Sequence, residues 1–239
     1  MDAISTDGNW TPEQARALQQ RLASRVVVDD RLPALDTVAG VDVGIENRTT
    51  ARAAVVVLRR SDLQPLDYAL ASEPVRFPYV PGLLSFREVP VILQALEKLA
   101  HTPDLMLVDG QGIAHPRGLG VASHLGLESG LPAVGVAKNR LVGDYEPVPE
   151  TKGSWSSLRY EGREIGAVLR TRSGVKPLFV SPGHRISLLT ALDEVMACVT
   201  RYRLPETTRW ADGIASGRGQ WQRKLNEALG PRSETQGKV

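Results

Sequence analysis

The sequence predicts an α/β domain built on a mixed sheet, in which three antiparallel strands precede parallel strands and helices cover both faces. Three strand-like segments with short polar connections lie between residues 37 and 75, which suits an antiparallel meander. From residue 85 onward apolar strands alternate with helical segments, the pattern of parallel pairing through crossover connections. The chain has 239 residues, 42% of them hydrophobic, which is enough to bury one sizeable core.

The first half of the chain begins with a helix signal. Thr11-Pro-Glu-Gln14 forms a capping box with proline at the first helical position, so we expect a helix over residues 11–27. The three antiparallel strands are expected over residues 37–45, 51–59 and 66–75. A helix should follow over residues 85–99, because its apolar residues recur at helical spacing.

The second half alternates strands with helices. Strands are expected over residues 105–109, 133–137, 165–171 and 178–181. Helices are expected over residues 120–129 and 187–202, with two shorter helices after them. A Pro/Gly/Ser-rich segment over residues 145–157 is expected to be irregular.

The predicted order of elements is that of the ribonuclease H-like fold, an analogy that by itself says nothing about substrate. No linker divides the chain, so we expect one domain over residues 1–230. Residues 231–239 have too little apolar content to pack and are expected to form a flexible tail.

Composition narrows the class of protein. The formal net charge is +2 and the pI is about 8.8, which permits nucleic acid as a partner without requiring it. The single cysteine, Cys198, excludes an internal disulfide and lies in an apolar helical segment, where it is expected to be a buried small hydrophobe. No apolar run approaches the ~20 residues that span a bilayer, and no signal segment is evident. We therefore expect a cytoplasmic monomer without a membrane partner.

Two strand-like segments each lead into an aspartate that glycines flank. They are Thr37-Val-Ala-Gly-Val-Asp42-Val-Gly44 and Leu105-Met-Leu-Val-Asp109-Gly-Gln-Gly112. A carboxylate at the end of a buried strand is costly unless it is hydrogen-bonded, paired or bound to a metal. Adjacent strands lie about 4.8 Å apart, so both carboxylates could share one hard divalent cation. The alternative is that both are turn-forming or helix-capping aspartates.

Three further kinds of residue could serve such a site. Glu88 either completes it or merely caps a helix, since Ser85-Phe-Arg-Glu88 is itself a capping box. Lys138 ends a predicted strand beside Asp109 and could neutralise a phosphate, although strand-end lysines are commonly just solvated. The histidines lack zinc spacing, but His115 lies in a glycine-rich loop where a functional role is plausible.

Five strings in the chain closely resemble the motifs of the endonuclease V (deoxyinosine 3′-endonuclease) family. The longest is Pro78-Tyr-Val-Pro-Gly-Leu-Leu-Ser-Phe-Arg-Glu88. The others are Val108-Asp-Gly-Gln-Gly-Ile-Ala-His-Pro-Arg117, Gly135-Val-Ala-Lys-Asn-Arg-Leu141, Gly183-His-Arg-Ile-Ser187 and Arg203-Leu-Pro-Glu-Thr-Thr-Arg-Trp-Ala-Asp212. They occur in family order over nearly the whole chain.

The resemblance implies a ribonuclease H-like, Mg²⁺-dependent enzyme, with Mn²⁺ as a substitute, that nicks DNA near deaminated bases. By this resemblance the cut falls at the second phosphodiester bond 3′ to deoxyinosine and leaves a 3′ hydroxyl and a 5′ phosphate. The sequence leaves open whether inosine-containing RNA is also cut.

The resemblance also assigns site residues. Asp42 and Asp109 match the metal ligands, and Glu88 matches the acidic residue that completes the site. Lys138 matches a lysine near the scissile phosphate, and Asp212 a further acidic position. Tyr79 matches a wedge that fills the gap left by a rotated base. The other residues expected to contact DNA are Pro78, Pro81, Gly82, Leu84, Gly110, His115 and Gly120.

Two other functions fit part of the pattern. An actin-like or sugar-kinase phosphotransferase also carries Gly-x-Asp-x-Gly and Asp-Gly-x-Gly loops, here Gly40 to Gly44 and Asp109 to Gly112. Such enzymes need two large lobes, for which 239 residues are short. A non-catalytic nucleic-acid-binding protein would not need the buried aspartates.

Overall fold

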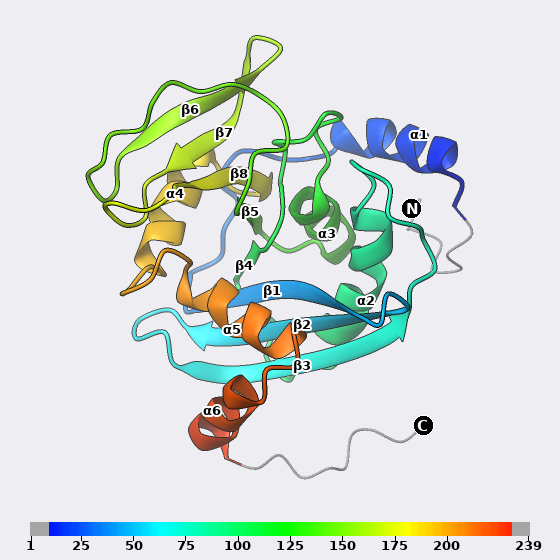
Figure 1. Cartoon of the computed structure of the whole chain (residues 1–239), viewed down its shortest axis with the longest axis vertical. Helices are drawn as coiled ribbons and strands as arrows, with labels where there is room; N and C mark the ends of the chain where they lie inside the picture. The colour runs from blue at the N-terminus through cyan, green and yellow to red at the C-terminus, as the bar shows by residue number, and fades with distance from the viewer. Residues whose placement is uncertain (1–9, 231–239) are drawn as a thin grey trace.

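A computed structural model of the chain describes residues 10–230 (Figure 1). Eight strands form one sheet in the order β3-β2-β1-β4-β5-β8-β7-β6. The strands are β1 (Thr37–Glu46), β2 (Thr50–Arg59), β3 (Pro65–Pro74), β4 (Leu105–Val108), β5 (Ala133–Ala137), β6 (Trp155–Tyr160), β7 (Arg163–Leu169) and β8 (Leu178–His184). The helices are α1 (Pro12–Ala23), α2 (Ser85–Glu97), α3 (Val121–Ser129), α4 (Leu188–Ala197), α5 (Glu206–Ala215) and α6 (Gly219–Leu229).

The strand pairing confirms the predicted ribonuclease H-like class. β1, β2 and β3 form the antiparallel meander, and β1, β4 and β5 pair in parallel. The sheet then differs from the prediction, because β8, β7 and β6 continue it with antiparallel pairing. A parallel pair needs a long crossover such as α3, whereas β6 and β7 are joined by a tight turn at Glu161 and Gly162, both with positive φ.

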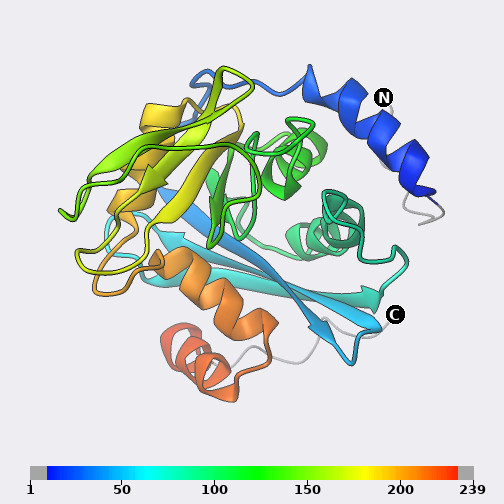
Figure 2. The ribbon, with the colours of Figure 1, turned by 45° about the horizontal axis from the view of Figure 1, so that its top comes forward.

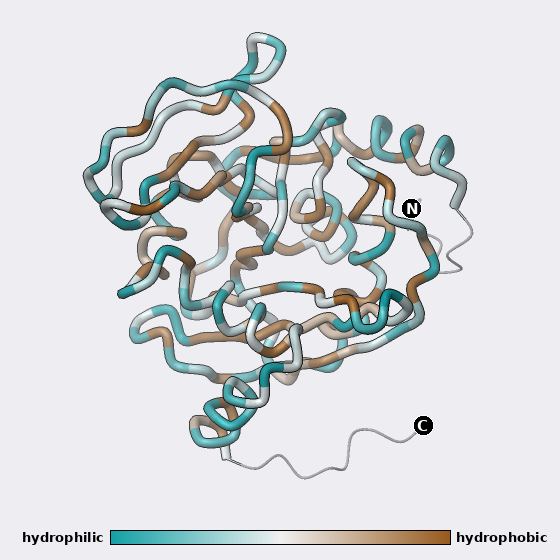
Figure 3. Tube along the Cα trace, viewed as in Figure 1, coloured by the Kyte–Doolittle hydropathy of each residue, from teal (hydrophilic) through white to brown (hydrophobic). Residues whose placement is uncertain are grey.

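Helices cover both faces of the sheet, as predicted (Figure 2). In β4, Leu105 and Leu107 face a core shared with α4, α5 and α6, whereas Met106 and Val108 face a core shared with α2 and α3. This alternation follows from the two-residue period of a strand. Both faces of β4 are therefore buried, and Figure 3 shows hydrophobic residues concentrated along the strands.

Helix α5 lies unusually close to β1. A Cβ atom at Gly40 would come within 1.9 Å of the Thr207 carbonyl oxygen, and one at Gly44 within 2.5 Å of the Ala215 carbonyl oxygen. Residues 40, 42 and 44 share one face of the strand, so Asp42 projects toward α5 between the two glycines. The glycines thus allow a helix to dock on the strand that carries the aspartate.

Most predicted elements are confirmed within one or two residues, and four differ more. Strand β8 ends at His184 rather than 181. The Thr11 capping box is present, but α1 ends at Ala23 rather than 27, before the β-branched residues 26–28. Helix α4 ends at Ala197 rather than 202, where the Cys198 carbonyl accepts from Glu206 N at the start of α5. β6 lies partly in the segment expected to be irregular. It is an edge strand next to β7 in the sheet, and its Arg159 also forms an isolated antiparallel bridge with Asp144.

Two expectations remain predictions. All described strands belong to one sheet, which is compatible with one domain. Residues 231–239, expected to form a flexible tail, lie outside the described residues. Within residues 10–230, no helix has both the length and the apolar composition needed to cross a bilayer.

Candidate active site

The structure brings Asp42 and Asp109 together where the parallel pairing of β1 with β4 ends. That pairing stops at Val41 and Val108, and Asp109 N donates to the Val41 carbonyl at 2.9 Å. Asp42 is therefore not at the end of its strand, as the sequence suggested, but at the first residue of β1 beyond the parallel pairing. The two carboxylates still meet because they follow equivalent positions on neighbouring parallel strands.

Asp212, on α5, is the third carboxylate of the site. One carboxylate oxygen from each of Asp42, Asp109 and Asp212 lies within 4.8 Å of the others, and all three side chains are partly exposed. Asp212 sits on α5 between Thr207 and Ala215, the residues whose backbone contacts Gly40 and Gly44. The close docking of α5 therefore supplies the third oxygen.

Glu88 faces this group without capping its helix. Helix α2 begins at Ser85, with Leu84 as its N-cap and no side-chain cap hydrogen bond, so the alternative in which Glu88 only caps the helix with Ser85 is wrong. Leu84 adopts helical dihedral angles, and the Glu88 amide donates to the Leu84 carbonyl instead. Glu88 interacts electrostatically with Asp42 and Asp109, although it is not in the 4.8 Å group found among the described residues.

Partial burial and mutual repulsion raise the pKa values of two of these acidic side chains. Burial, followed by the charges of Asp42 and Asp109, raises the pKa of Glu88 to about 8. Burial and the Asp109 charge raise the pKa of Asp42 to about 7, although Lys138 and the Val43 amide act in the opposite direction. The full negative charge of the cluster is thus disfavoured near neutral pH.

Two basic side chains already contact the cluster. Lys138 Nζ lies 2.5 Å from Asp109 Oδ2 and 3.4 Å from Asp212 Oδ1. Although burial opposes its charged form, these carboxylates raise the pKa of Lys138, which is therefore a cation. Arg218, which precedes α6, donates to Asp212 Oδ2. The pKa values of Asp42 and Glu88 remain raised even with Lys138 beside the cluster. A further cation bound by the carboxylates would lower them.

The donor set fits a hard divalent cation. Mg²⁺ prefers oxygen ligands and is commonly bound through one or two carboxylates, with water and phosphate oxygens completing the coordination. Three clustered carboxylate oxygens with excess negative charge meet that preference, whereas a zinc site would call for nitrogen or sulfur ligands.

A pocket of about 420 Å³ adjoins the acidic cluster, and Asp109 and Lys138 belong to its lining. Most residues predicted to contact DNA line this pocket. They are Tyr79, Pro81, Gly82, Leu84, Gly110, His115 and Gly120. Pro78 is not among the lining residues. Tyr79 is 70% exposed, so its ring is not packed into the protein.

Sequence reasoning missed three residues near the site. Gln19 lines the pocket from α1, and Arg117 contacts both Gln19 and Gly82. A signal for Gln19 was available, because it is a polar residue beside Ala15, Leu18 and Leu22 on the apolar side of its helix. Arg218 carried no such signal, since its role depends on where α5 ends.

The ribonuclease H-like sheet and the carboxylate cluster at its parallel strands together define a metal-binding nuclease class. Comparison with known proteins agrees. The family model for endonuclease V matches residues 20–213. Endonuclease V of Nostoc punctiforme is 56% identical over 216 residues, covering 89% of this chain and 98% of that protein.

Solved structures extend this similarity to three dimensions. Endonuclease V of Streptomyces avermitilis superposes with a TM-score of 0.84 at 44% identity, covering 95% of this chain and 98% of the other. Endonuclease V of Ciona intestinalis, solved with a 24mer DNA containing an inosine followed by a ribo-adenosine, gives a TM-score of 0.75 at 27% identity. The superposition covers 89% of this chain and 98% of the Ciona chain.

The chain belongs to the endonuclease V family. It is therefore a DNA repair endonuclease, a hydrolase that cleaves DNA within a strand. This excludes the phosphotransferase and the non-catalytic nucleic-acid-binding protein as its function.

Proposed function

We propose that this protein recognises DNA containing deoxyinosine and, with Mg²⁺, nicks the second phosphodiester bond 3′ to the lesion. The products carry a 3′ hydroxyl and a 5′ phosphate. The observation that carries the proposal is that the pocket and the acidic cluster adjoin. Asp109 and Lys138 line the pocket and also contact each other at the cluster. A base rotated into the pocket therefore leaves its own strand lying across the carboxylates.

In this proposal Asp42, Asp109 and Asp212 hold the cation, and Glu88 adds negative charge behind them. When bound, Mg²⁺ polarises the scissile phosphate and lowers the pKa of a bound water, and Mn²⁺ can substitute because it accepts the same oxygen ligands. A cation held by the cluster would offset the repulsion that raises the pKa values of Asp42 and Glu88, and so would favour their charged forms.

Lys138 has a separate role in the proposal. Its ammonium group lies between Asp109 and Asp212, so it is held at the edge of the cluster while remaining partly exposed. A phosphate that approaches the carboxylates meets this positive charge first. Lys138 thereby orients the scissile phosphate and offsets the repulsion between phosphate and carboxylates.

The pocket side of the proposal concerns the altered base. Tyr79 stacks into the gap that the rotated base leaves, and Pro78 and Pro81 restrict the backbone on either side of it. The backbone at Gly82, Gly110 and Gly120 approaches the base closely, while Leu84 and His115 complete the wall. A weakly paired base costs less to rotate, which favours the lesion.

The test is a duplex that carries a single deoxyinosine, incubated with the protein and Mg²⁺, with product ends mapped at nucleotide resolution. We expect one nick, at the second phosphodiester 3′ to the lesion, and no nick in the matched undamaged duplex. An Asp109→Ala variant should bind the lesion but not cut, and Ca²⁺ should support binding with little cutting because its looser coordination positions water poorly. Cutting at another register, or without preference for inosine, would contradict the proposal.

The same assay addresses RNA. A strand with inosine as a ribonucleotide, run beside the deoxyinosine duplex, measures the relative rates on the two substrates.

A further inference from the structure

Gln19 is a fully buried polar residue in the middle of α1. Around it, Ala15, Leu18 and Leu22 pack into an apolar cluster with Phe77 and Leu83. A buried amide is costly unless its donors and acceptor are paired, and those of Gln19 are. Its Nε2 donates to two backbone carbonyls and its Oε1 accepts from Arg117 Nε at 2.6 Å.

The two carbonyls belong to two segments that line the same pocket. Gln19 Nε2 lies 3.0 Å from the Gly82 oxygen, in the segment that follows Tyr79. It lies 3.1 Å from the Leu119 oxygen, in the segment that leads into α3. Gln19, Gly82 and Leu119 all line the pocket. Because the two hydrogens of one amide group serve the two carbonyls, Gln19 fixes the separation of the segments.

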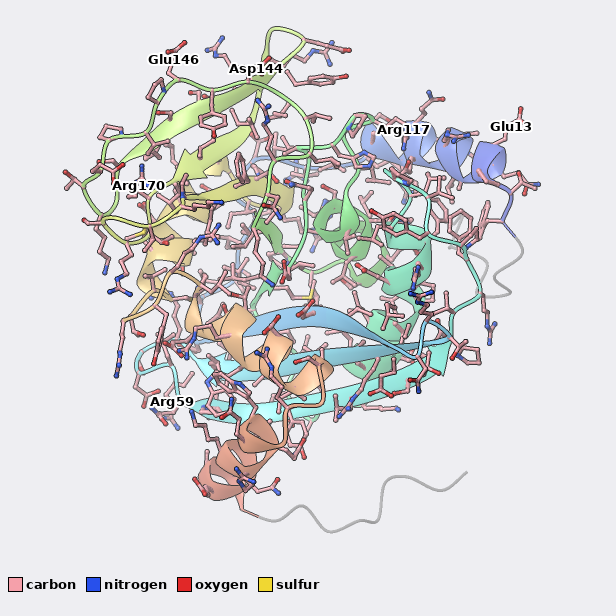
Figure 4. All side chains as sticks on the ribbon, viewed as in Figure 1. Glu13, Arg59, Arg117, Asp144, Glu146 and Arg170 are labelled. Carbon is pink, nitrogen blue, oxygen red and sulfur yellow. The ribbon has the colours of Figure 1, made fainter. Side chains whose placement is uncertain are left out.

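The Gly82 carbonyl also accepts from Arg117 Nη2 at 2.7 Å and lies 3.0 Å from His115 Nε2. His115 Nδ1 accepts from the Arg117 amide at 3.2 Å, so the ring proton is on Nε2 and points at Gly82. Gly82 has a φ of +76°, a left-handed conformation that glycine adopts without strain. Figure 4 shows Arg117 beside α1, the helix that carries its partner Gln19. Gln19, His115 and Arg117 thus all contact the carbonyl oxygen of Gly82.

We propose that Gln19 is a positioning residue that sets the width of the base pocket and thereby the discrimination between deoxyinosine and normal bases. This inference rests on the proposed function, in which the pocket receives the rotated base. Gln19 does not touch the reacting atoms; it holds the Gly82 and Leu119 segments at a fixed separation. It lies just outside residues 20–213, the range that the family model matches.

The test compares variants that break different parts of the contact. Gln19→Ala removes the whole amide. Gln19→Glu keeps the side-chain volume and the acceptor for Arg117 but loses both donors to the carbonyls. Gln20→Ala is the matched control, because Gln20 is the same residue type on the same helix and is exposed.

The readout is the ratio of two dissociation constants, for an undamaged duplex and for the same duplex with one deoxyinosine, measured with Ca²⁺. We expect the ratio to fall by about tenfold in Gln19→Ala and Gln19→Glu, the scale of one or two lost hydrogen bonds. The affinity for undamaged DNA should change by less than about twofold, since phosphate contacts dominate it. With Mg²⁺, KM for the inosine duplex should rise while kcat stays nearly constant. Gln20→Ala should match wild type in every measurement.

Each other outcome overturns the inference. A wild-type ratio in Gln19→Glu would show that Gln19 serves only to anchor Arg117. A lower melting temperature with an unchanged ratio in both variants would show that Gln19 only stabilises the packing of α1. If the wild-type protein itself has no preference for inosine, the proposed function fails, and that result is seen before any variant is compared.

Discussion

Gly40 in β1 lies directly beneath Thr207 in α5, so closely that a Cβ atom at position 40 would come within 1.9 Å of the Thr207 carbonyl oxygen. This contact determines where α5 sits, and α5 carries Asp212 to the carboxylates of Asp42 and Asp109. The glycine is thus needed for helix packing rather than for the approach of a phosphate.

The first prediction concerns that contact. Gly40→Ala should destabilise the protein by about 1–3 kcal/mol, the usual cost of overpacking, because a backbone carbonyl cannot rotate away as a side chain can. It should also slow nicking, since α5 and Asp212 must shift. Gly219→Ala is the control: Gly219 begins α6, and among the described residues nothing lies within 4 Å of its added Cβ. Equal melting temperatures and nicking rates for the two variants would contradict the prediction.

This contact also marks a limit of what the sequence predicts. The adjacency of β1 and β4 follows from the order of elements, and with it the meeting of Asp42 and Asp109. The position of Asp212 does not follow, because nothing in a Gly-x-Asp-x-Gly pattern says which helix will use the space. The pattern was compatible with a phosphate loop as well, and only the packed structure shows Gly40 and Gly44 against α5.

The second prediction concerns Tyr79. Stacking on a base is worth roughly 1–3 kcal/mol, so Tyr79→Ala should weaken binding to the inosine duplex by about ten- to a hundredfold. Tyr79→Phe should lose much less, because it keeps the ring. The side chain is 70% exposed, so neither change should lower the melting temperature by more than about 2 °C. A lower melting temperature with normal affinity would mean that the tyrosine only packs against its own segment.

The pocket was predictable in part. The Pro/Gly-rich segment around Tyr79 and the glycine-rich loop after Asp109 both indicated a binding surface, and the structure places both in one lining. Its support from α1 was not predicted, because a contact between Gln19 and Leu119 spans 100 residues and depends on how α1 docks. Local patterns predict elements well but do not determine such long-range contacts.

The third prediction concerns His124, which is fully buried on α3 beside Phe86. Within residues 10–230, neither ring nitrogen has a hydrogen-bond partner, and burial lowers the pKa of His124 to about 3. The Glu128 carboxylate lies 3.9 Å away, but a neutral ring forms no ion pair with it. The unfolded state therefore binds a proton that the folded state does not between about pH 6.5 and 3, and stability falls as pH falls through this window.

His124→Leu should remove this contribution. The free energy of unfolding, measured with urea from pH 7 to pH 4, should fall less steeply in the variant than in wild type. The two slopes should differ by at most about 1.4 kcal/mol per pH unit, the contribution of one titrating group. Some acid sensitivity should remain, because burial also lowers the pKa values of His115 and His184 to about 4. At pH 7 the variant should be as stable as wild type to within about 1 kcal/mol. The substitution removes two buried ring nitrogens that form no hydrogen bond within the described residues, so no hydrogen bond is lost with them. Parallel pH profiles would contradict the prediction.

The last prediction concerns Glu88, now that the structure has removed its role as a cap. Its folded-state pKa of about 8 exceeds the ordinary value of 4.5, so the folded protein holds a proton that the unfolded chain releases. The sign is opposite to that of His124: without a metal, stability falls as pH rises from about 4.5 to 8. Glu88→Gln should remove the contribution of Glu88, because an amide does not titrate, while the raised pKa of Asp42 leaves part of the loss in place. In EDTA at pH 8, the variant should therefore melt at or above the wild-type temperature.

The same substitution should reduce nicking. Glutamine cannot supply the negative charge that Glu88 places behind Asp42 and Asp109, so the cation is held less tightly and its water is less well oriented. We expect the nicking rate of Glu88→Gln at fixed Mg²⁺ to fall by about two orders of magnitude, with partial recovery as Mg²⁺ is raised. A stable variant that nicks normally would instead show that Asp42, Asp109 and Asp212 hold the cation without Glu88. The raised pKa of Glu88 would then be a consequence of its burial, with no part in catalysis.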